Sequence, residues 1–252
     1  MMLSIKHAEL TFNANTNIEK KLFTDLNIDF VKGDFTTIIG PNGSGKSSIL
    51  NVITGVYRLD AGEIILRDQN ITHVSQWKRA RYIGRVFQNP MQGLAPDLTL
   101  IENFAVMLNK REKGSLHIAV TKKNKDRIKE ELLALRINLE DKLECRPGEL
   151  SGGQCQAAAL ILAVLSEPLI LLLDEHTAAL DPKSAKNIME LTEKLIQDKK
   201  ITAIMVTHNI NDALRYGDRM VMMKEGNVIL DIRDTDKEKI SSNDIFNMYG
   251  MM

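Results

Sequence analysis

Cysteine is scarce in this chain of 252 residues, which contains only Cys145 and Cys155. The two cysteines form no CxxC pair and have no cluster of histidines nearby, so the sequence predicts neither a zinc site nor a disulfide framework. We expect two free thiols in a reducing compartment.

Charge of one sign is also missing, because 33 Lys and Arg residues balance 33 Asp and Glu residues. A neutral chain produces no overall field that attracts nucleic acid or anionic lipid, and we expect no nucleic-acid partner. The segment Lys110–Arg127 is nevertheless rich in Lys and Arg. We interpret this segment as a solvated loop or face, and a functional basic patch is the alternative.

Long hydrophobic runs are the third absence. The longest nearly apolar region, Ala157–Leu173, is interrupted by Glu167 and Pro168, and neither piece reaches the ~20 residues that span a membrane. The N-terminal segment lacks the apolar stretch of a signal peptide. We therefore expect a soluble, cytoplasmic chain that acts at a membrane only through a partner.

Short apolar segments alternate with segments of helical spacing along the chain. The expected strands are Ser4–Phe12, Leu26–Val31, Phe35–Ile39, Glu63–Leu66, Tyr82–Phe87, Leu169–Leu173, Ile201–Val206, Arg219–Met223 and Asn227–Asp231. The expected helices are Lys46–Thr54, Leu98–Leu108, Asp126–Leu135, Cys155–Leu165 and one that begins at Pro182. This alternation is typical of an α/β fold with a mostly parallel sheet covered on both faces.

A glycine-rich loop joins one expected strand to the following helix. It fits the GxxxxGK[ST] pattern of phosphate-binding loops and consists of Gly40, Pro41, Asn42, Gly43, Ser44, Gly45, Lys46 and Ser47, followed by Ser48. Such a loop surrounds phosphate oxygens with backbone N–H groups. We expect Lys46 to reach the β and γ phosphates of ATP and the Ser47 hydroxyl to bind Mg²⁺. An ordinary glycine-rich turn is the alternative.

Two acidic residues, Asp174 and Glu175, follow the aliphatic strand Leu169–Leu173. A strand of this kind places a carboxylate at the edge of the sheet, beside the phosphate loop. We expect Asp174 to hold Mg²⁺ through water and Glu175 to polarise the attacking water as general base.

A second phosphate-seeking helix start is expected at Ser151, Gly152, Gly153 and Gln154, immediately before the apolar helix Cys155–Leu165. A serine and two glycines at the start of a helix leave backbone N–H groups available to an anion. Taken alone, this pattern is more typical of a flexible helix cap.

Together these motifs, with Ala179-Leu180-Asp181 and Thr207-His208 after them, resemble those of the ABC ATPases, in the order of that family. The resemblance covers essentially the whole chain. It implies a P-loop NTPase fold with two lobes. One is a RecA-like core with an antiparallel β portion, formed by approximately 1–88 and 167–252, and the other is an α-helical subdomain at approximately 89–166.

The resemblance also implies roles for single residues. Ser151, Gly152, Gly153 and Gln154 of one subunit are expected to close on ATP held by the other subunit of a head-to-tail dimer. Gln88 is expected to sense Mg²⁺ and the attacking water, and His208 to sense the γ-phosphate. Asp181 falls in the loop through which subunits communicate. Phe12 lies where the family stacks an aromatic ring on adenine, although a Phe at a strand end is often part of the core.

The sequence departs from the family pattern in three places. His176 stands where the family usually has Pro, the residues Cys155–Ala159 lack the common basic side chains, and Ser48 replaces the commoner Thr. None of these changes removes a group expected to bind phosphate or Mg²⁺. The motifs resemble most a subgroup of bacterial importer ATPases, which work with a separate permease and binding protein and are in some cases associated with aromatic amino acids.

The sequence leaves three functions open. The first is a transporter motor, peripheral on the inner face of the cell membrane, with Asn89–Leu108 facing an integral membrane permease. The second is a soluble ABC machine that acts on nucleic acid or the ribosome. The balanced charge and the absence of sustained heptads argue against it. The third is a nucleotide-binding regulator without turnover, which the carboxylate of Glu175 argues against.

Overall fold

The computed structural model of the chain describes residues 1–109, 120–135 and 137–250. The strands are β1 (Leu3–Phe12), β2 (Lys20–Phe30), β3 (Phe35–Ile39), β4 (Ala61–Leu66), β5 (Gln69–Asn70), β6 (Ile83–Val86), β7 (Ile170–Asp174), β8 (Thr202–Val206), β9 (Arg219–Lys224) and β10 (Asn227–Arg233). The α-helices are α1 (Lys46–Thr54), α2 (Gln76–Arg79), α3 (Leu100–Asn109), α4 (Lys122–Leu135), α5 (Gly152–Leu165), α6 (Pro182–Lys199), α7 (Ile210–Arg215), α8 (Asp234–Glu238) and α9 (Ser242–Gly250). Two short 3₁₀ helices are η1 (Pro90–Gln92) and η2 (Pro147–Glu149).

A six-stranded sheet in the order β10-β9-β3-β8-β7-β6 forms the centre of the molecule. Strands β9, β3, β8, β7 and β6 are parallel to their neighbours, and β10 pairs with β9 in an antiparallel hairpin. All residues of β3 and β8 are buried, as strands covered on both faces require. The parallel, covered sheet predicted from the sequence is confirmed.

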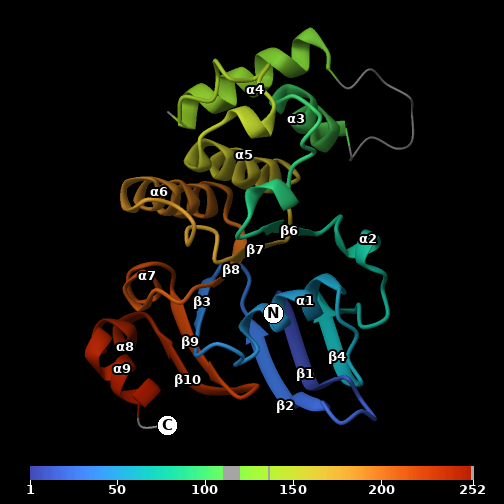
Figure 1. The fold of residues 1–252 in the computed structure, drawn as a ribbon, viewed down its shortest axis with the longest axis vertical. Helices are drawn as coiled ribbons and strands as arrows, with labels where there is room; N and C mark the ends of the chain where they lie inside the picture. The colour runs from blue at the N-terminus through green and yellow to red at the C-terminus, as the bar shows by residue number, and fades with distance from the viewer. Residues whose placement is uncertain (110–119, 136, 251–252) are drawn as a thin grey trace.

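The two faces of this sheet carry different layers. Side chains such as Leu171, Leu173 and Met205 pack against α5 and α6. Their neighbours along the same strands, such as Leu172 and Ile204, share a second core with α1 and the other sheet. Because side chains alternate between the faces of a strand, α1 and α5 lie on opposite faces of the central sheet (Figure 1).

The second sheet has four antiparallel strands in the order β2-β1-β4-β5. It is the antiparallel β portion that the family resemblance implied, and it packs beside α1. Strand β2 begins at Lys20, well before the expected start at Leu26. The reason is its pairing with β1, which continues as far as Phe12 opposite Lys20 and buries Leu22 and Phe23 among charged neighbours.

Helices α3, α4 and α5 form a separate layer at one end of the molecule (Figure 1). From Cys155 through Leu165 every residue of α5 is buried, since α5 contacts α3 and η1 on one side and α6 and β6 on the other. The boundaries of the helical subdomain at 89 and 166 stay a prediction.

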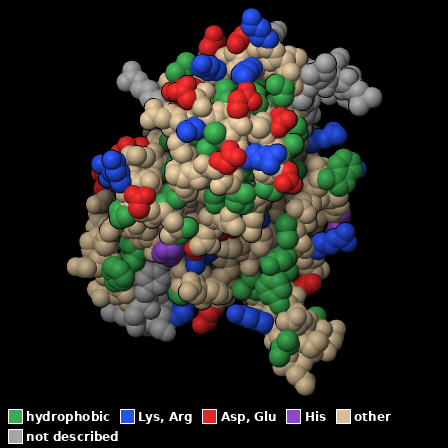
Figure 2. All heavy atoms as spheres, turned by 45° about the horizontal axis from the view of Figure 1, so that its top comes forward, with side chains coloured by type: hydrophobic (Ala, Val, Ile, Leu, Met, Phe, Trp, Pro, Cys, Tyr) green, Lys and Arg blue, Asp and Glu red, His purple; other side chains and the backbone are tan. Residues whose placement is uncertain are grey.

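Helix α4 begins at Lys122, earlier than the start at Asp126 that was predicted from the sequence. Thr121 accepts a hydrogen bond from the backbone N–H of Asn124 at 3.2 Å, which favours a helix start here. The end of the basic segment is thus an exposed face of a helix, and 110–119 lie outside the described residues. Figure 2 shows basic and acidic side chains interspersed over this layer, with no patch of one charge on the visible face.

Cys145 and Cys155 are both free. Across residues 1–109, 120–135 and 137–250, no cluster of three or more His, Cys, Asp or Glu side chains is arranged to hold a metal. Nor does any helix in these ranges combine the length and apolar character needed to cross a membrane.

Candidate nucleotide site

The phosphate loop joins β3 to α1 with the backbone geometry that its glycines permit. Gly45 directly precedes α1 with φ 103°, and a Cβ there would lie 2.7 Å from the ring of Phe23. Only glycine tolerates both the left-handed backbone and this close approach. Within the described residues no side chain caps α1, so the first N–H groups of the helix remain available to an anion.

Lys46 folds back into the loop. Its ammonium group donates to the carbonyl oxygens of Gly40 and Pro41 at 2.8 and 3.0 Å. Burial lowers the pKa of Lys46, while the nearby carboxylates of Glu175 and Asp174 raise it. The three side chains predicted to surround the phosphates and Mg²⁺ are therefore close in space, although they are far apart in the sequence.

Asp174 ends β7 beside the first turn of α1. Ser47 Oγ donates to Asp174 Oδ1 at 3.1 Å, so the two predicted Mg²⁺ ligands are in contact. The second oxygen, Asp174 Oδ2, accepts a hydrogen bond from Arg85 at 2.7 Å. Sequence reasoning missed Arg85, although a charged residue in the middle of an apolar strand was an available signal.

Glu175 and His208 also meet, as Nδ1 of His208 lies 3.3 Å from Glu175 Oε2. The Glu175 backbone is left-handed, with φ 45°, and its N–H donates to the carbonyl of Val206 at 2.9 Å. A non-glycine residue in this conformation is held by its surroundings. Both side chains line one cavity of about 450 Å³ together with Thr177, Asn209 and Asp212.

His176, the departure from the family pattern, is only 2% exposed. Its Nε2 lies 3.1 Å from Oγ1 of Thr192, and that hydroxyl donates to the carbonyl of Ile188 at 2.7 Å. The Thr192 oxygen is then left as acceptor, which makes Nε2 of His176 the donor. Burial lowers the pKa of His176 to about 4, so the ring is neutral and ties the chain after Glu175 to α6.

Gln88 lies exposed beyond the end of β6. Among the described residues, the hydrogen-bond partners of Asp174 are Ser47 and Arg85, and Gln88 is not one of them. The loop around it is held by Gln156, whose side-chain amide donates to the carbonyl of Phe87 at 3.2 Å.

The predicted second anion site stands apart from the phosphate loop. Ser151 Oγ accepts from the N–H of Gln154 at 3.3 Å, and Gln154 Oε1 accepts from the N–H of Ser151 at 3.1 Å. This capping box satisfies part of the helix start from within. Since α5 and α1 lie on opposite faces of the sheet, these residues do not meet the phosphate loop of their own chain.

Asp181 caps the start of α6. Its Oδ1 accepts from the backbone N–H groups of Lys183 and Ser184, each at 3.1 Å. The hydrogen bonds from the Ser184 side chain and backbone lower the pKa of Asp181. The same first turn lies against the glycines of α5, since a Cβ at Gly153 would come within 3.2 Å of Ser184.

Phe12 is half-buried at the end of β1, and its ring meets that of Tyr57 edge to face at 5.2 Å. It pairs with Lys20 across β1 and β2, and a Cβ at Gly43 would lie 3.7 Å from the Lys20 ammonium. Phe12 is thus on the strand edge next to the phosphate loop. Tyr57 and Lys20 were not foreseen, because only the tertiary fold brings them here.

Comparison with known proteins agrees with this geometry. The family model described as "ABC transporter" matches residues 23–178. The tyrosine transport ATP-binding protein of Clostridioides difficile is 40% identical over 98% of both chains. The spermidine/putrescine import ATP-binding protein PotA of Haemophilus influenzae is 35% identical over 91% of this chain, which spans 57% of that relative's length.

Among solved structures, the dimeric post-hydrolysis state of the ATP-binding cassette MJ0796 bound to ADP and Pi superposes with a TM-score of 0.79. The sequence identity to it is 31%, and the match covers 92% of this chain and 98% of that one. The chain therefore belongs to the ABC transporter family, as an ATP-binding cassette that hydrolyses ATP within a transport system.

Proposed function

We propose that two copies of this chain bind ATP and Mg²⁺ between them, head to tail, and that hydrolysis drives a separate membrane permease. The observation that carries the proposal is the meeting of Ser47, Asp174, Glu175 and His208 around the start of α1. These groups come from three segments of the chain, and a merely structural turn requires none of them.

The oxygen donors fit Mg²⁺. A hydroxyl at Ser47 and a carboxylate at Asp174, in contact at 3.1 Å, are hard oxygen groups of the kind this ion takes, Asp174 through a water. Gln88 would complete the set once it turns toward them. Bound there with ATP, Mg²⁺ would neutralise charge on the phosphate oxygens.

The remaining residues divide the work. The phosphate loop from Gly40 to Ser48 would bind the phosphates through backbone N–H groups and the ammonium of Lys46. Glu175 would accept the proton of the attacking water, and His208, 3.3 Å away, would orient that carboxylate and contact the γ-phosphate. Phe12 would stack on adenine.

The dimer completes the site. Ser151, Gly152, Gly153 and Gln154 lie on the face of the sheet away from their own phosphate loop, so a second copy must supply them. Asp181 lies at the start of α6, next to these residues, where it would connect closure of one site to the other.

Glu175→Gln tests the catalytic assignment. The amide cannot accept a proton, so we expect ATP turnover to fall at least 100-fold, about 3 kcal/mol in the barrier, while ATP binding is unchanged. Dimers loaded with Mg²⁺ and ATP should accumulate on size-exclusion chromatography. Unaltered turnover in this variant would remove Glu175 from its role.

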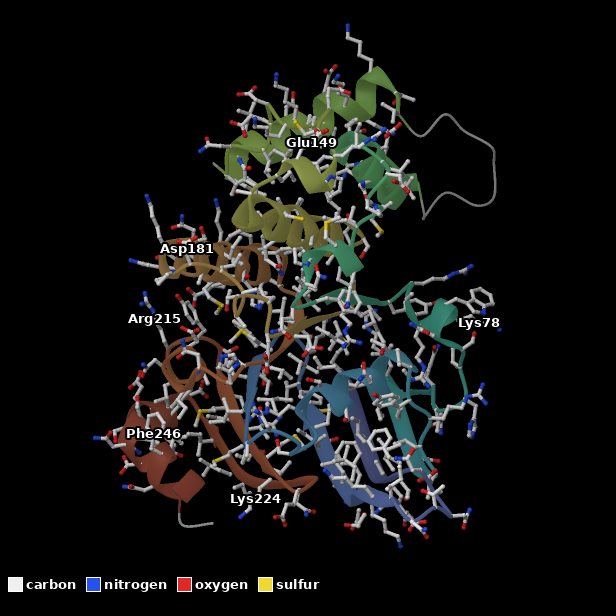
Figure 3. All side chains as sticks on the ribbon, viewed as in Figure 1. Lys78, Glu149, Asp181, Arg215, Lys224 and Phe246 are labelled. Carbon is white, nitrogen blue, oxygen red and sulfur yellow. The ribbon has the colours of Figure 1, made fainter. Side chains whose placement is uncertain are left out.

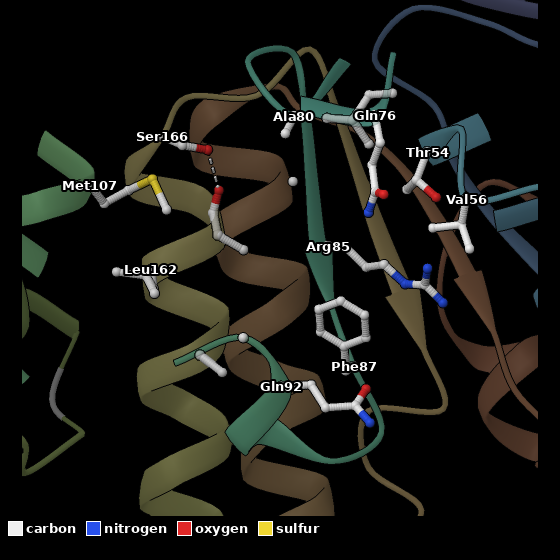
Figure 4. A pocket seen from close by; sticks show the side chains of 15 residues that line it. Thr54, Val56, Gln76, Ala80, Arg85, Phe87, Gln92, Met107, Leu162 and Ser166 are labelled. Atoms are coloured by element: carbon white, nitrogen blue, oxygen red, sulfur yellow. Dashed lines mark hydrogen bonds between the residues drawn. The ribbon is translucent and has the colours of Figure 1, made fainter. Parts of the chain in front are cut away.

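A groove of about 290 Å³ between the helical layer and α2 is where we propose the permease docks (Figure 4). The predicted segment Asn89–Leu108 supplies Gln92, Gly93 and Met107 to this groove, and the rest comes from other elements. Trp77, beside the groove, is 64% exposed, with Lys78 and Arg81 within 5.4 and 5.9 Å of its ring. Figure 3 shows Lys78 on the outer side of α2, beside the groove. A large exposed aromatic ring is typical of an interface hot spot.

The cargo we propose is a small amino acid-like molecule, imported with the help of a separate binding protein. The supporting observation is the 40% identity to a tyrosine transport ATP-binding protein over nearly the whole chain. In cells the chain would then lie on the inner face of the membrane, held there by its permease.

A detergent-solubilised pull-down from native cells tests the partners. We expect a multi-span membrane protein in near-equal amount, and a loss of most of it with Trp77→Ala. Recovery of ribosomes or nucleic acid instead would favour a soluble ABC machine.

A further inference from the structure

Arg85 is a charged residue in the middle of β6, and its side chain is only 13% exposed. One guanidinium nitrogen donates to Asp174 Oδ2 and another to Asn51 Oδ1, each at 2.7 Å. The guanidinium also lies over the ring of Phe87, with 4.7 Å between its carbon and the ring centre. Arg85 thus connects β6, β7 and α1 at one point.

The partner of Arg85 is the carboxylate that would serve Mg²⁺. Ser47 occupies Asp174 Oδ1, and Arg85 occupies Asp174 Oδ2. A divalent ion at Ser47 and Asp174 would therefore meet a guanidinium already paired with its ligand. Because two cations compete for one carboxylate, the binding of either one weakens the hold of the other.

The present arrangement leaves Arg85 incompletely satisfied. Among the described residues Nε of Arg85 has no hydrogen-bond partner and is fully buried. An unpaired buried donor costs free energy. Because the guanidinium is not fully hydrogen-bonded in this position, the free-energy cost of moving it away from Asp174 is lower.

Arg85 also belongs to the groove. Its side chain lines the same groove as Val56, Gln76 and Gln92 (Figure 4). A movement of the guanidinium away from Asp174 therefore changes the wall of the groove. No other charged side chain in the described lining of this groove contacts Asp174.

We propose that Arg85 is a positioning residue that holds Asp174 until Mg²⁺ binds and whose release from Asp174 reshapes the groove. The inference rests on the proposed function, since it requires that nucleotide and Mg²⁺ bind at the phosphate loop. It gives the metal site a physical connection to the surface where a partner would dock.

The test measures ADP affinity by calorimetry at increasing Mg²⁺, for wild type and for Arg85→Met, and finds the Mg²⁺ concentration of half-maximal effect. Removing the competing cation should lower that concentration at least threefold. Arg127→Met, which removes the same charge from an exposed site on α4, should leave it unchanged, and Arg85→Lys should fall between. An unchanged or raised requirement in Arg85→Met would overturn the competition.

The change in the groove is measured separately, by the fluorescence of Trp77, the one tryptophan of the chain. Adding Mg²⁺ to the ADP-loaded wild type should change the fluorescence of Trp77, and Arg85→Met should abolish most of that change. An equal change in both proteins, or none in the wild type, would refute the connection to the groove. As a control, the ADP affinity of Arg85→Met without Mg²⁺ must match that of the wild type. Arg85→Gln replaces Arg85→Met in both measurements if the methionine variant does not fold. If the wild type binds no nucleotide at all, the proposed function fails instead.

Discussion

The starts of α1 and α5 are two solutions to the same physical problem on opposite faces of one sheet. Each helix begins with N–H groups that have no partner within the helix. At α5 a capping box between Ser151 and Gln154 supplies partners from within. At α1 the residue before the helix is Gly45, and no described side chain caps the helix.

This difference indicates that the start of α1, and not that of α5, is suited to bind a ligand within one chain. The start of α1 has uncapped N–H donors, a folded-back Lys46 and two carboxylates nearby. The start of α5 has a capping box of its own, and under the proposed function it contributes to ATP binding only in the dimer.

Lys46→Ala should remove most of the ATP binding at the start of α1. The variant loses the ammonium group that would donate charge-assisted hydrogen bonds to phosphate oxygens, and we expect ATP affinity to fall about 1,000-fold, about 4 kcal/mol. Calorimetric titration of the monomer with ATP measures it. Normal affinity would contradict the assignment of the phosphate loop.

Lowering the pH should destabilise the face that carries α5 and α6. The unfolded chain protonates His176 near pH 6.5, but burial holds its pKa in the fold at about 4. The free energy of unfolding therefore decreases as the pH falls from 6.5 toward 4, by about 3 kcal/mol in total. Urea unfolding curves across this range should show a shallower decrease for His176→Gln. Identical slopes would mean that His176 is accessible to protons in the fold.

Phe12→Ala should weaken ATP binding by about 2 kcal/mol, the stabilisation of a base stacked on a ring. Phe12→Tyr keeps the ring and should bind like wild type. Affinities for ATP and GTP should fall together, because stacking reads the face of the base and not its edge. Unchanged ATP affinity in Phe12→Ala would point to a core role for this ring.

Ser151→Ala should distinguish the role of the start of α5 from that of the start of α1, at a small loss of stability. Loss of the cap is expected to lower the free energy of unfolding by about 1 kcal/mol and to leave ATP binding to the monomer unchanged. Turnover, which requires the dimer, should decrease. Reduced ATP affinity in the monomer would show that both helix starts serve the same bound nucleotide.

Much of the fold followed from local patterns. The strand Phe35–Ile39 and the helix Lys46–Thr54 were predicted with the boundaries that the structure has, because glycines and an aliphatic run mark both. The early starts of β2 and α4 were missed, since pairing with β1 and a cap at Thr121 extend segments that begin with lysines.

The sequence by itself determined the chemistry of this protein. A phosphate loop, an acidic pair after an aliphatic strand and a second glycine-rich helix start are local patterns, and their order indicates the family. Local patterns suffice there because turn geometry and helix starts depend on adjacent residues.

Only the tertiary structure decided which side chains share a site. Arg85 on Asp174, Tyr57 against Phe12, and His176 bonded to Thr192 all join segments distant in the chain. The parallel sheet brings the ends of its strands to one edge, and the burial of its two faces separates α1 from α5. Such contacts depend on packing in three dimensions, which no spacing along a single chain encodes.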